Sequence, residues 1–108
     1  MMEEETTFRE RVEMTVSQIP IGRLMTYGQI AAICGNARAA RIVGGIAHFG
    51  DAHLPWQRVV SKQGMMASGF PGGRQAHREL LENEGIIVGD DFKVDIKELI
   101  WYPNTPGR

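Results

Sequence analysis

Residues 26–49 read TYGQIAAICGNARAARIVGGIAHF, and this stretch decides the fold. Thr26 is followed three residues later by Gln29, a capping-box spacing that starts a helix. The apolar pattern extends that helix from Tyr27 to Cys34. Gly35-Asn36 then supplies the residues that favour a helix C-cap and a tight turn. The first half of the stretch therefore predicts a short helix and a turn.

The second half predicts another helix, from Ala37 to Phe49, with Ile42, Ile46 and Phe49 facing inward. Two short helices separated by a glycine-containing turn are the outline of a helix-turn-helix. Small side chains on both helices would let them approach closely. These are Ala31, Ala32, Ala39 and Ala40.

A further helix is expected upstream of this pair. Thr7 and Glu10 form a second capping box, and the apolar spacing extends the helix from Phe8 to Gln18. Pro20 and Gly22 then end it.

Downstream of the pair, the pattern changes to strands. Residues 58–61 predict a short strand, 62–64 a turn, and 65–67 a return strand, which together would make a small wing. A last long helix is expected from Arg74 to Glu84, with residues 86–88 folding back on its end. The apolar run 99–102 contains Trp101, expected in the core. The fold class is thus mainly α, a small winged helix-turn-helix domain with a short β wing.

Size and composition favour one small domain covering residues 1–108, with 43% hydrophobic residues for its core. No stretch approaches the roughly 20 apolar residues of a membrane span, and the acidic start lacks the apolar core of a signal peptide. The single cysteine, Cys34, excludes an intramolecular disulfide and fits the reducing cytoplasm. The scattered histidines predict no metal site, and no cofactor is expected.

The net charge of −1 conceals an uneven distribution. Residues 20–78 hold seven bases against the single acid Asp51, so this block carries a charge near +6, whereas residues 1–19 and 79–108 are acidic. The seven bases are Arg23, Arg38, Arg41, Arg58, Lys62, Arg74 and Arg78. The block is either a footprint for a polyanion such as DNA or a chance clustering of solvated charges.

Five motifs between residues 19 and 85 resemble, in order, those of the O6-alkylguanine-DNA alkyltransferases. Ile19–Ala31 is similar to the family's Ile-Pro-x-Gly-x-Val-x-Thr-Tyr-Gly-x-Ile-Ala, and Ala39–Gly45 to its Ala-Ala-Arg-Ala-Val-Gly segment. Leu54–Val60 matches Pro-Cys-His-Arg-Val-(Val/Ile), and Ser68–Gly73 the loop Gly-x-Tyr-x-Gly-Gly. Glu84-Gly85 matches the end of the helix behind the active site. The chain is identified as a member of this superfamily.

Trp56 stands where the family has its alkyl-accepting cysteine, and Gln57 where it has the histidine. A thiolate activated by a base attacks an alkyl carbon, whereas an indole offers only a ring face and one N–H donor. The resemblance therefore points to the alkyltransferase-like branch, which is not enzymatic, and predicts no catalytic residue. Arg58 is expected to support its loop internally, and Glu84 to act as a structural hydrogen-bonding group.

The resemblance implies that DNA is bound through its minor groove. Tyr27 would crowd the phosphate beside an extruded nucleotide, where free amides of a helix start also favour a phosphate. Arg41 would enter the vacated space and pair with the orphaned cytosine. On their residues alone, each has an alternative: Tyr27 as a core aromatic and Arg41 as a solvated helix-face charge. The expected DNA-binding residues are Thr26, Tyr27, Ala37, Ala40, Arg41 and Gly44.

A pocket for the extruded base is implied beside this surface. Trp56 would stack on the base, an interaction worth about 1–3 kcal/mol; the alternative is a core tryptophan. Phe70 replaces the family's tyrosine, and the adaptable Met65 and Met66 suggest tolerance of bulky alkyl groups. The expected pocket residues are Trp56, Gln57, Met66, Ser68, Gly69 and Phe70.

Three functions remain in competition at this point. The first is a monomeric, cytoplasmic, nucleoid-associated sensor that flips O6-alkylguanine out of double-stranded DNA, marks it for nucleotide excision repair proteins and competes with alkyltransferase. The second is a winged-helix regulator of intact sequences. The third is a residual alkyltransferase using Cys34, which its position near a helix C-terminus disfavours because the dipole raises a thiol pKa there.

Overall fold

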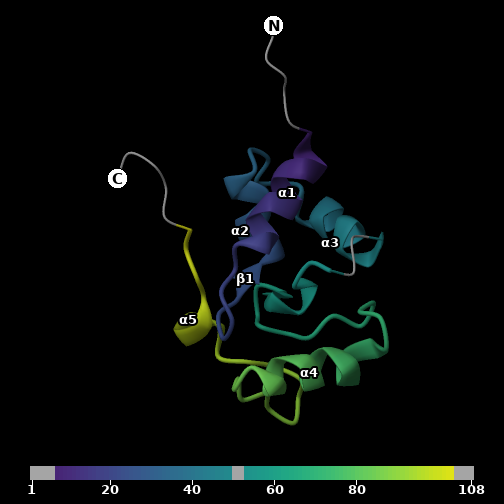
Figure 1. Cartoon of the computed structure of the whole chain (residues 1–108), viewed down its shortest axis with the longest axis vertical. Helices are drawn as coiled ribbons and strands as arrows, with labels where there is room; N and C mark the ends of the chain where they lie inside the picture. Colours follow the sequence, from purple (N-terminus) through teal and green to yellow (C-terminus); the bar gives the residue numbers. More distant parts are fainter. Residues whose placement is uncertain (1–6, 50–52, 104–108) are drawn as a thin grey trace, which may run out of the picture.

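The fold is mainly helical, with a short pair of parallel strands between two groups of helices (Figure 1). The computed structural model describes residues 7–49 and 53–103. The elements in chain order are α1 (Phe8–Ser17), β1 (Met25–Thr26), α2 (Tyr27–Ile33), α3 (Ala40–Phe49), the 3-10 helix η1 (Trp56–Arg58), β2 (Val59–Val60), α4 (Gly73–Asn83) and α5 (Ile96–Leu99). Helices α1, α2 and α3 gather at one end of the molecule and α4 at the other. Within the described ranges, no helix has the length and apolar character needed to cross a bilayer.

Both predicted capping boxes are present. At α1, Thr7 Oγ1 accepts from the Glu10 amide at 3.0 Å while the Glu10 carboxylate accepts from the Thr7 amide at 2.9 Å. At α2, Thr26 Oγ1 accepts from the Gln29 amide at 3.0 Å, and Gln29 Oε1 accepts in return from the Thr26 amide at 3.2 Å. These bonds satisfy amides that have no partner within their helices, so both helices begin where the sequence predicts.

Helix α3 begins at Ala40, three residues later than the predicted Ala37. Asn36 explains the delay, because its side-chain oxygen accepts from the Arg38 amide and its carbonyl from the Ala39 amide. Such an Asx turn competes with helical hydrogen bonding. The helix-turn-helix outline holds, but Ala37 lies in the turn.

The inward face of α3 also differs from the prediction. Val43 is completely buried and Ile46 packs against the core, whereas Ile42 is 56% exposed. Phe49 was also expected inside, and its side chain lies outside the described part of the structure. The prediction for Ile42 is therefore wrong: it takes the solvent side, next to Arg41.

The predicted strand at residues 58–61 forms at Val59–Val60, but the expected hairpin partner is wrong. β2 pairs in parallel with β1, with Met25 opposite Val59. The segment expected to return, 65–67, instead takes partners from the tail: Met65 bridges Lys93, and the Met66 amide donates to the Phe92 carbonyl at 2.9 Å. The predicted turn at 62–64 does form, because the Gly64 amide donates to the Ser61 carbonyl at 2.8 Å and the Ser61 amide to the Met65 carbonyl at 3.3 Å. The pairs with Phe92 and Lys93 take the place of the expected return strand.

Helix α4 runs from Gly73 to Asn83, one residue earlier at each end than predicted, and closes at Gly85 as expected. Gly85 has a φ of 88°, the Gly85 amide donates to Glu82, and the Ile86 amide donates to Leu81, which is a Schellman motif. Ile86 and Val88 then fold back into the core, whereas Ile87 between them is 87% exposed. Extended backbone alternates its side chains, which explains the difference.

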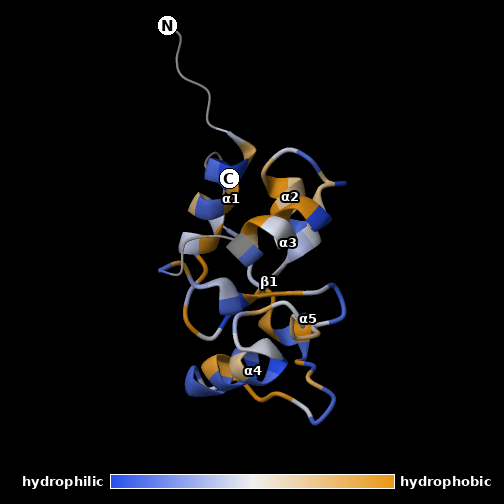
Figure 2. Ribbon diagram, turned by 90° about the vertical axis from the view of Figure 1, so that its right-hand side faces the viewer, coloured by the Kyte–Doolittle hydropathy of each residue, from blue (hydrophilic) through white to orange (hydrophobic). Residues whose placement is uncertain are grey.

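Two hydrophobic clusters make up the core. The first joins α1, α2 and α3 to Trp56 and Val59, and the second joins Leu24 and Val60 to α4 and the tail. Hydrophobic and hydrophilic segments alternate along α1 and α4, as the orange and blue of Figure 2 show. The strand pair runs between the clusters, and η1, which directly precedes β2, lies beside the helix-turn-helix through Trp56.

The C-terminal tail completes the core. Its backbone flanks Leu24, whose amide donates to Leu99 at 3.0 Å and whose carbonyl accepts from Trp101 at 2.8 Å. Gln29 Nε2 donates to the Trp101 carbonyl at 2.6 Å. Trp101 packs against the first cluster, as the sequence predicts.

Candidate nucleic-acid interface and pocket

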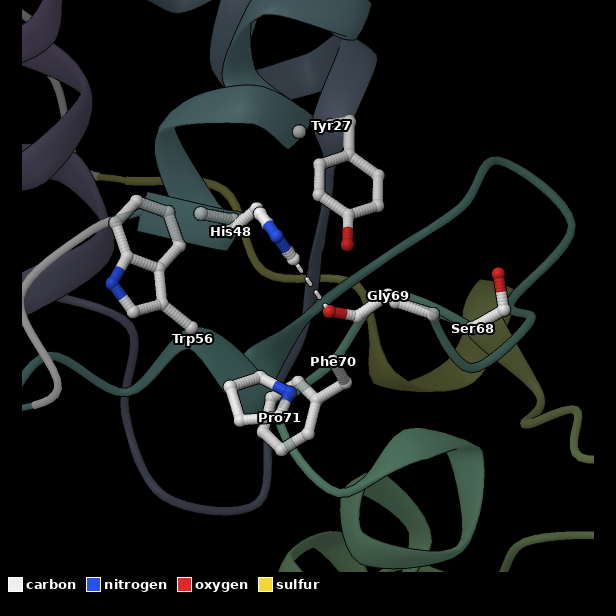
Figure 3. Close-up of a pocket in the computed structure, with 10 residues that line it drawn as sticks. Tyr27, His48, Trp56, Ser68, Gly69, Phe70 and Pro71 are labelled. Carbon is white, nitrogen blue, oxygen red and sulfur yellow. Dashed lines mark hydrogen bonds between the residues drawn. The ribbon is translucent and has the colours of Figure 1, made fainter.

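A cavity of about 290 Å³ opens between the helix-turn-helix and the loop that precedes α4 (Figure 3). Three segments form it: the start of α2, the face of α3 beyond Gly44, and the residues 67–71 facing Trp56. The lining residues are Tyr27, Gly44, Ala47, His48, Trp56, Ala67, Ser68, Gly69, Phe70 and Pro71. The volume is at the small end of the range for small-molecule sites, about 300–1,000 Å³, and suits a single nucleobase.

Trp56 belongs both to the core and to this cavity. The residue is 7% exposed and packs in the first hydrophobic cluster, yet its indole borders the same space as Tyr27 and His48. The two interpretations of this tryptophan are therefore compatible. A buried indole is held in a fixed orientation, which suits a wall against which a flat ring can stack.

Two predicted pocket residues lie elsewhere. Gln57 turns away from the cavity because its side-chain amide donates to Glu84 Oε2 at 2.9 Å. Met66 is 1% exposed and sits in the second hydrophobic cluster, because backbone bonds to the tail draw its segment into the core. Neither residue lines the cavity, whereas the predicted Trp56, Ser68, Gly69 and Phe70 do.

Glu84 is the hub that holds η1 against α4. Its carboxylate accepts from Arg58 Nε at 2.9 Å, from Gln57 Nε2, and from the Gly22 amide at 2.9 Å. Arg58 also donates to the Ile19 carbonyl at 2.8 Å. The predictions that Arg58 supports its loop internally and that Glu84 is a structural group are confirmed. One charge of the basic block is thereby neutralised inside the protein.

The sequence reasoning missed His77, the one buried polar residue among those described. Its Nδ1 accepts from the Ala67 amide at 3.1 Å, and its Nε2 donates to the Gln57 carbonyl at 2.8 Å. Burial lowers the pKa of this imidazole, while the bond to Gln57 acts in the opposite direction. In the sequence, only its position on the inner face of the predicted helix 74–84 could have indicated that His77 is buried.

His48 is a second residue that sequence reasoning missed. Its imidazole lines the cavity, and its Nδ1 lies 3.1 Å from the Gly69 carbonyl, so α3 is tied to the loop across the cavity (Figure 3). Because a carbonyl oxygen only accepts, Nδ1 carries the proton in this bond. A spacing of seven residues from Arg41 places both on one helix face, which was the usable signal.

The predicted DNA-binding residues lie on the two helices of the helix-turn-helix, except Ala37 in the turn. Thr26 caps α2, and Tyr27 follows at its first turn. Burial raises the pKa of the Tyr27 phenol, so its hydroxyl stays protonated and can donate to a phosphate oxygen. Arg41 is exposed on α3, and Gly44 leads from it to the cavity. The remaining member, Ala40, is half-buried at the start of α3.

Cys34 lies apart from the cavity. Its side chain is 3% exposed at the C-cap of α2, with its sulfur 3.5 Å from Thr15 Oγ1. The cavity lining contains no cysteine. Within residues 7–49 and 53–103, no group of three or more His, Cys, Asp or Glu side chains is arranged to hold a metal ion.

Comparisons with known proteins fit this arrangement. Residues 7–86 match the family model of the 6-O-methylguanine DNA methyltransferase DNA-binding domain. A DNA base-flipping protein of Escherichia coli is 37% identical over 102 residues, which cover 93% of this chain and 78% of that protein. Alkyltransferase-like protein 1 of Schizosaccharomyces pombe is 32% identical over 103 residues, 89% of this chain and 95% of that protein.

The structural match is equally specific. The crystal structure of S. pombe Atl1 in complex with damaged DNA containing O6-carboxymethylguanine superposes with a TM-score of 0.82, at 31% identity. It covers 89% of this chain and 95% of that one. The chain is thus a helix-turn-helix DNA-binding domain that belongs to the 6-O-methylguanine DNA methyltransferase DNA-binding family, and to its alkyltransferase-like branch.

Proposed function

We propose that the protein is a non-catalytic sensor of O6-alkylguanine in double-stranded DNA. It docks its helix-turn-helix in the minor groove, rotates the damaged nucleotide out of the stack and holds the base in the cavity beside Trp56. The observation that carries the proposal is the position of this indole: an unreactive aromatic wall borders a base-sized cavity next to an exposed arginine.

The energetics of flipping favour a damaged base. Extruding a nucleotide costs a few kcal/mol, and least when the base is poorly paired. Stacking on an aromatic side chain returns about 1–3 kcal/mol. Arg41, three residues before Gly44 on α3, is placed to fill the space that the base leaves. The apolar lining from Ala47, Phe70 and Pro71 accommodates an alkyl substituent, and we expect both methyl and larger adducts to bind.

No alkyl group is transferred in this proposal. The nucleophile of the family is replaced by Trp56, and Cys34 is buried at the opposite end of α2 from Tyr27. Intact-protein mass spectrometry after incubation with O6-methylguanine DNA tests this point. The mass should stay unchanged. A gain of one methyl group, mapped to Cys34, would instead identify a residual alkyltransferase.

A sensor that changes nothing covalent needs another activity to remove the lesion. We propose that the distorted complex is handed to nucleotide excision repair in the cytoplasm, where the protein associates with the nucleoid. While it is bound, it shields the lesion from alkyltransferases. Adding the protein should therefore slow methyl transfer by an alkyltransferase and stimulate incision of the same duplex by excision-repair proteins.

A binding titration with two duplexes that differ only in one guanine tests the central proposal. The duplex containing O6-methylguanine should bind more tightly than the unmodified one, in several sequence contexts. Equal affinity for the two would reject the sensor. A preference for one unmodified sequence would identify a winged-helix regulator, which reads base edges rather than damage.

A further inference from the structure

We propose that His77 is a positioning residue that sets the lesion preference of the pocket, and that it does so only as the neutral, Nε2-protonated imidazole. It joins the two walls that hold the base but does not itself line the cavity. The inference rests on the proposed function and extends it to a residue outside the family motifs described above.

The two bonds of His77 lead to the two segments that wall the cavity. Nδ1 accepts from the Ala67 amide, at the start of the loop 67–71 that lines the cavity, and Nε2 donates to the Gln57 carbonyl, immediately after Trp56. One imidazole therefore spans the loop and η1 from its fixed place on α4. These two bonds connect the segment that carries the indole directly to the loop, in addition to the contacts that Glu84 and His48 make with each.

His77 also contacts the cavity wall through its ring, which packs against Phe70. The Phe70 and His77 rings are stacked, with centroids 4.5 Å apart and planes inclined by 19°. Phe70 lines the cavity on its other side. His77 consequently supports an aromatic wall from behind, and movement of the imidazole changes the shape that a base meets.

The bonding pattern permits one protonation state. The Ala67 amide is a donor, so Nδ1 must lack a proton, and the Gln57 carbonyl is an acceptor, so Nε2 must carry one. Adding a proton to Nδ1 breaks the bond to the loop and buries a charge in a residue that is completely inaccessible. Burial accordingly lowers the pKa of His77.

Charged groups reach the partners of His77 from each neighbouring element. Gln57 is bonded to Glu84, which is paired with Arg58. On the loop side, Arg74 donates to the Met66 carbonyl and His48 to the Gly69 carbonyl. Of these groups, His48 is the other imidazole, so its contribution must be separated from that of His77 experimentally.

The sign of the pH dependence follows. The folded pocket favours neutral His77, so its pKa is lower in the native state than in the unfolded chain. Both hydrogen bonds of His77 are present at a pH above the ordinary pKa of histidine. The bond to Ala67 is lost as the pH falls through the lowered pKa of His77 in the folded protein. Preference for the lesion should decline toward acid, while docking of α3 on undamaged DNA should be unaffected by His77.

The experiment measures the ratio of affinities for O6-methylguanine and guanine duplexes from pH 8 to pH 5. Wild type is compared with His77→Asn and His77→Gln on the same DNA, so that titration of the DNA itself cancels. Asn can place its carbonyl oxygen near Nδ1, and Gln its amide near Nε2; neither side chain titrates. Circular dichroism at each pH reports that the proteins are folded.

For wild type the ratio should fall several-fold over this range. His77→Asn, which can keep an acceptor for the loop but loses the bond to Gln57 and the ring contact with Phe70, should lower the ratio about fivefold at pH 8 and make it independent of pH. His77→Gln, which loses the bond to the loop, should reduce the ratio about fivefold at every pH, the size expected for one hydrogen bond. His48→Gln should retain the pH dependence of the ratio, because His77 is intact there.

Nitrogen-15 NMR of wild type provides a readout that needs no variant. His77 should show the neutral Nε2–H tautomer at pH 7, and its titration should coincide with loss of the affinity ratio. A charged or Nδ1–H imidazole at pH 7, or a ratio that is constant with pH and unchanged in both His77 variants, would overturn the inference. Absence of any lesion preference in wild type at pH 8 would instead reject the proposed function itself.

Discussion

At the residue scale, position 56 shows how one side chain combines packing and recognition. The indole of Trp56 is nearly inaccessible, and its contacts with the first hydrophobic cluster fix its orientation before any ligand arrives. A preorganised aromatic surface loses little entropy when a base stacks on it. Trp56 is thus a rigid aromatic wall of the cavity.

Replacing this wall should affect both stability and discrimination. Trp56→Ala is expected to lower the free energy of unfolding by about 3–5 kcal/mol, because it leaves a cavity in the core. It should also lower the ratio of the affinity for the O6-methylguanine duplex to that for the guanine duplex. Thermal denaturation and the two-duplex titration separate the effects. Lower stability with an unchanged preference would mean that Trp56 is only a core residue.

Arg41 is predicted to act on DNA alone. Arg41→Ala should weaken binding to the lesion duplex by about 1–3 kcal/mol, because its guanidinium no longer fills the space left by the flipped base. Stability should be unchanged, since the residue is exposed. Arg78→Ala is the matched control: Arg78 lies on α4 and pairs with Glu82. Equal losses for both variants would indicate a diffuse charge effect.

Residue-level predictions succeeded where a motif fixed both position and partner. Arg58 and Glu84 are examples, because their family positions implied an internal role that the structure bears out. Gln57 and Met66 were misplaced because adjacency in sequence says nothing of side-chain direction. His77 was missed because its two partners, Ala67 and Gln57, become neighbours only in the folded chain.

At the scale of elements, helix starts were the most predictable feature. A capping box is a local arrangement of four residues, and both boxes form as expected at α1 and α2. The start of α3 and the partner of β2 were predicted incorrectly. An Asx turn at Asn36 overrode the apolar pattern, and backbone partners near residues 92–94 replaced the predicted hairpin, which no local pattern revealed.

The two capping boxes provide an internal comparison. Thr7→Ala and Thr26→Ala should each reduce stability by about 1 kcal/mol, since each removes the side-chain acceptor of a helix cap. Only Thr26→Ala should also weaken DNA binding, because α2 carries Tyr27 at the proposed interface. Denaturant unfolding and the titration with damaged duplex measure the two effects. Similar binding losses would argue against a role for the start of α2.

The hydrogen bonds of Glu84 should contribute most of the stability that holds η1 against α4. Glu84→Ala is expected to cost about 3–5 kcal/mol of stability, because it leaves the largely buried Arg58 without its partner. Glu82→Ala on the same helix removes an exposed i,i+4 pair with Arg78 and should cost less than about 0.5 kcal/mol. Melting temperatures of the two variants give the comparison. Equal values would mean that the Glu84 pair contributes nothing beyond a surface contact.

At the scale of the whole molecule, the distribution of charge matters more than its sum. The net charge is −1, yet Arg38 and Arg41 are exposed around the helix-turn-helix, and the acids concentrate toward the two ends of the sequence. Arg58 is withdrawn from this surface by Glu84. An overall acidic protein can therefore present a locally basic face to a polyanion.

This distribution predicts a steep dependence of DNA binding on salt. The logarithm of the observed association constant should fall linearly with the logarithm of the salt concentration, with a slope of about −0.9 for each phosphate neutralised. The slope should be nearly the same for damaged and intact duplexes, because the backbone contacts are shared. Titrations between low and physiological salt measure it. A flat dependence would exclude the proposed groove docking.

The path of the C-terminal segment has a mechanical consequence. Val94 and Ile96 pack in the second cluster, and Trp101, a few residues later, packs in the first. The tail thus links the two hydrophobic clusters. Unfolding of either cluster would remove packing contacts of the tail that also stabilise the other. Heating should unfold the two clusters in a single cooperative transition, because the same short tail completes both of them.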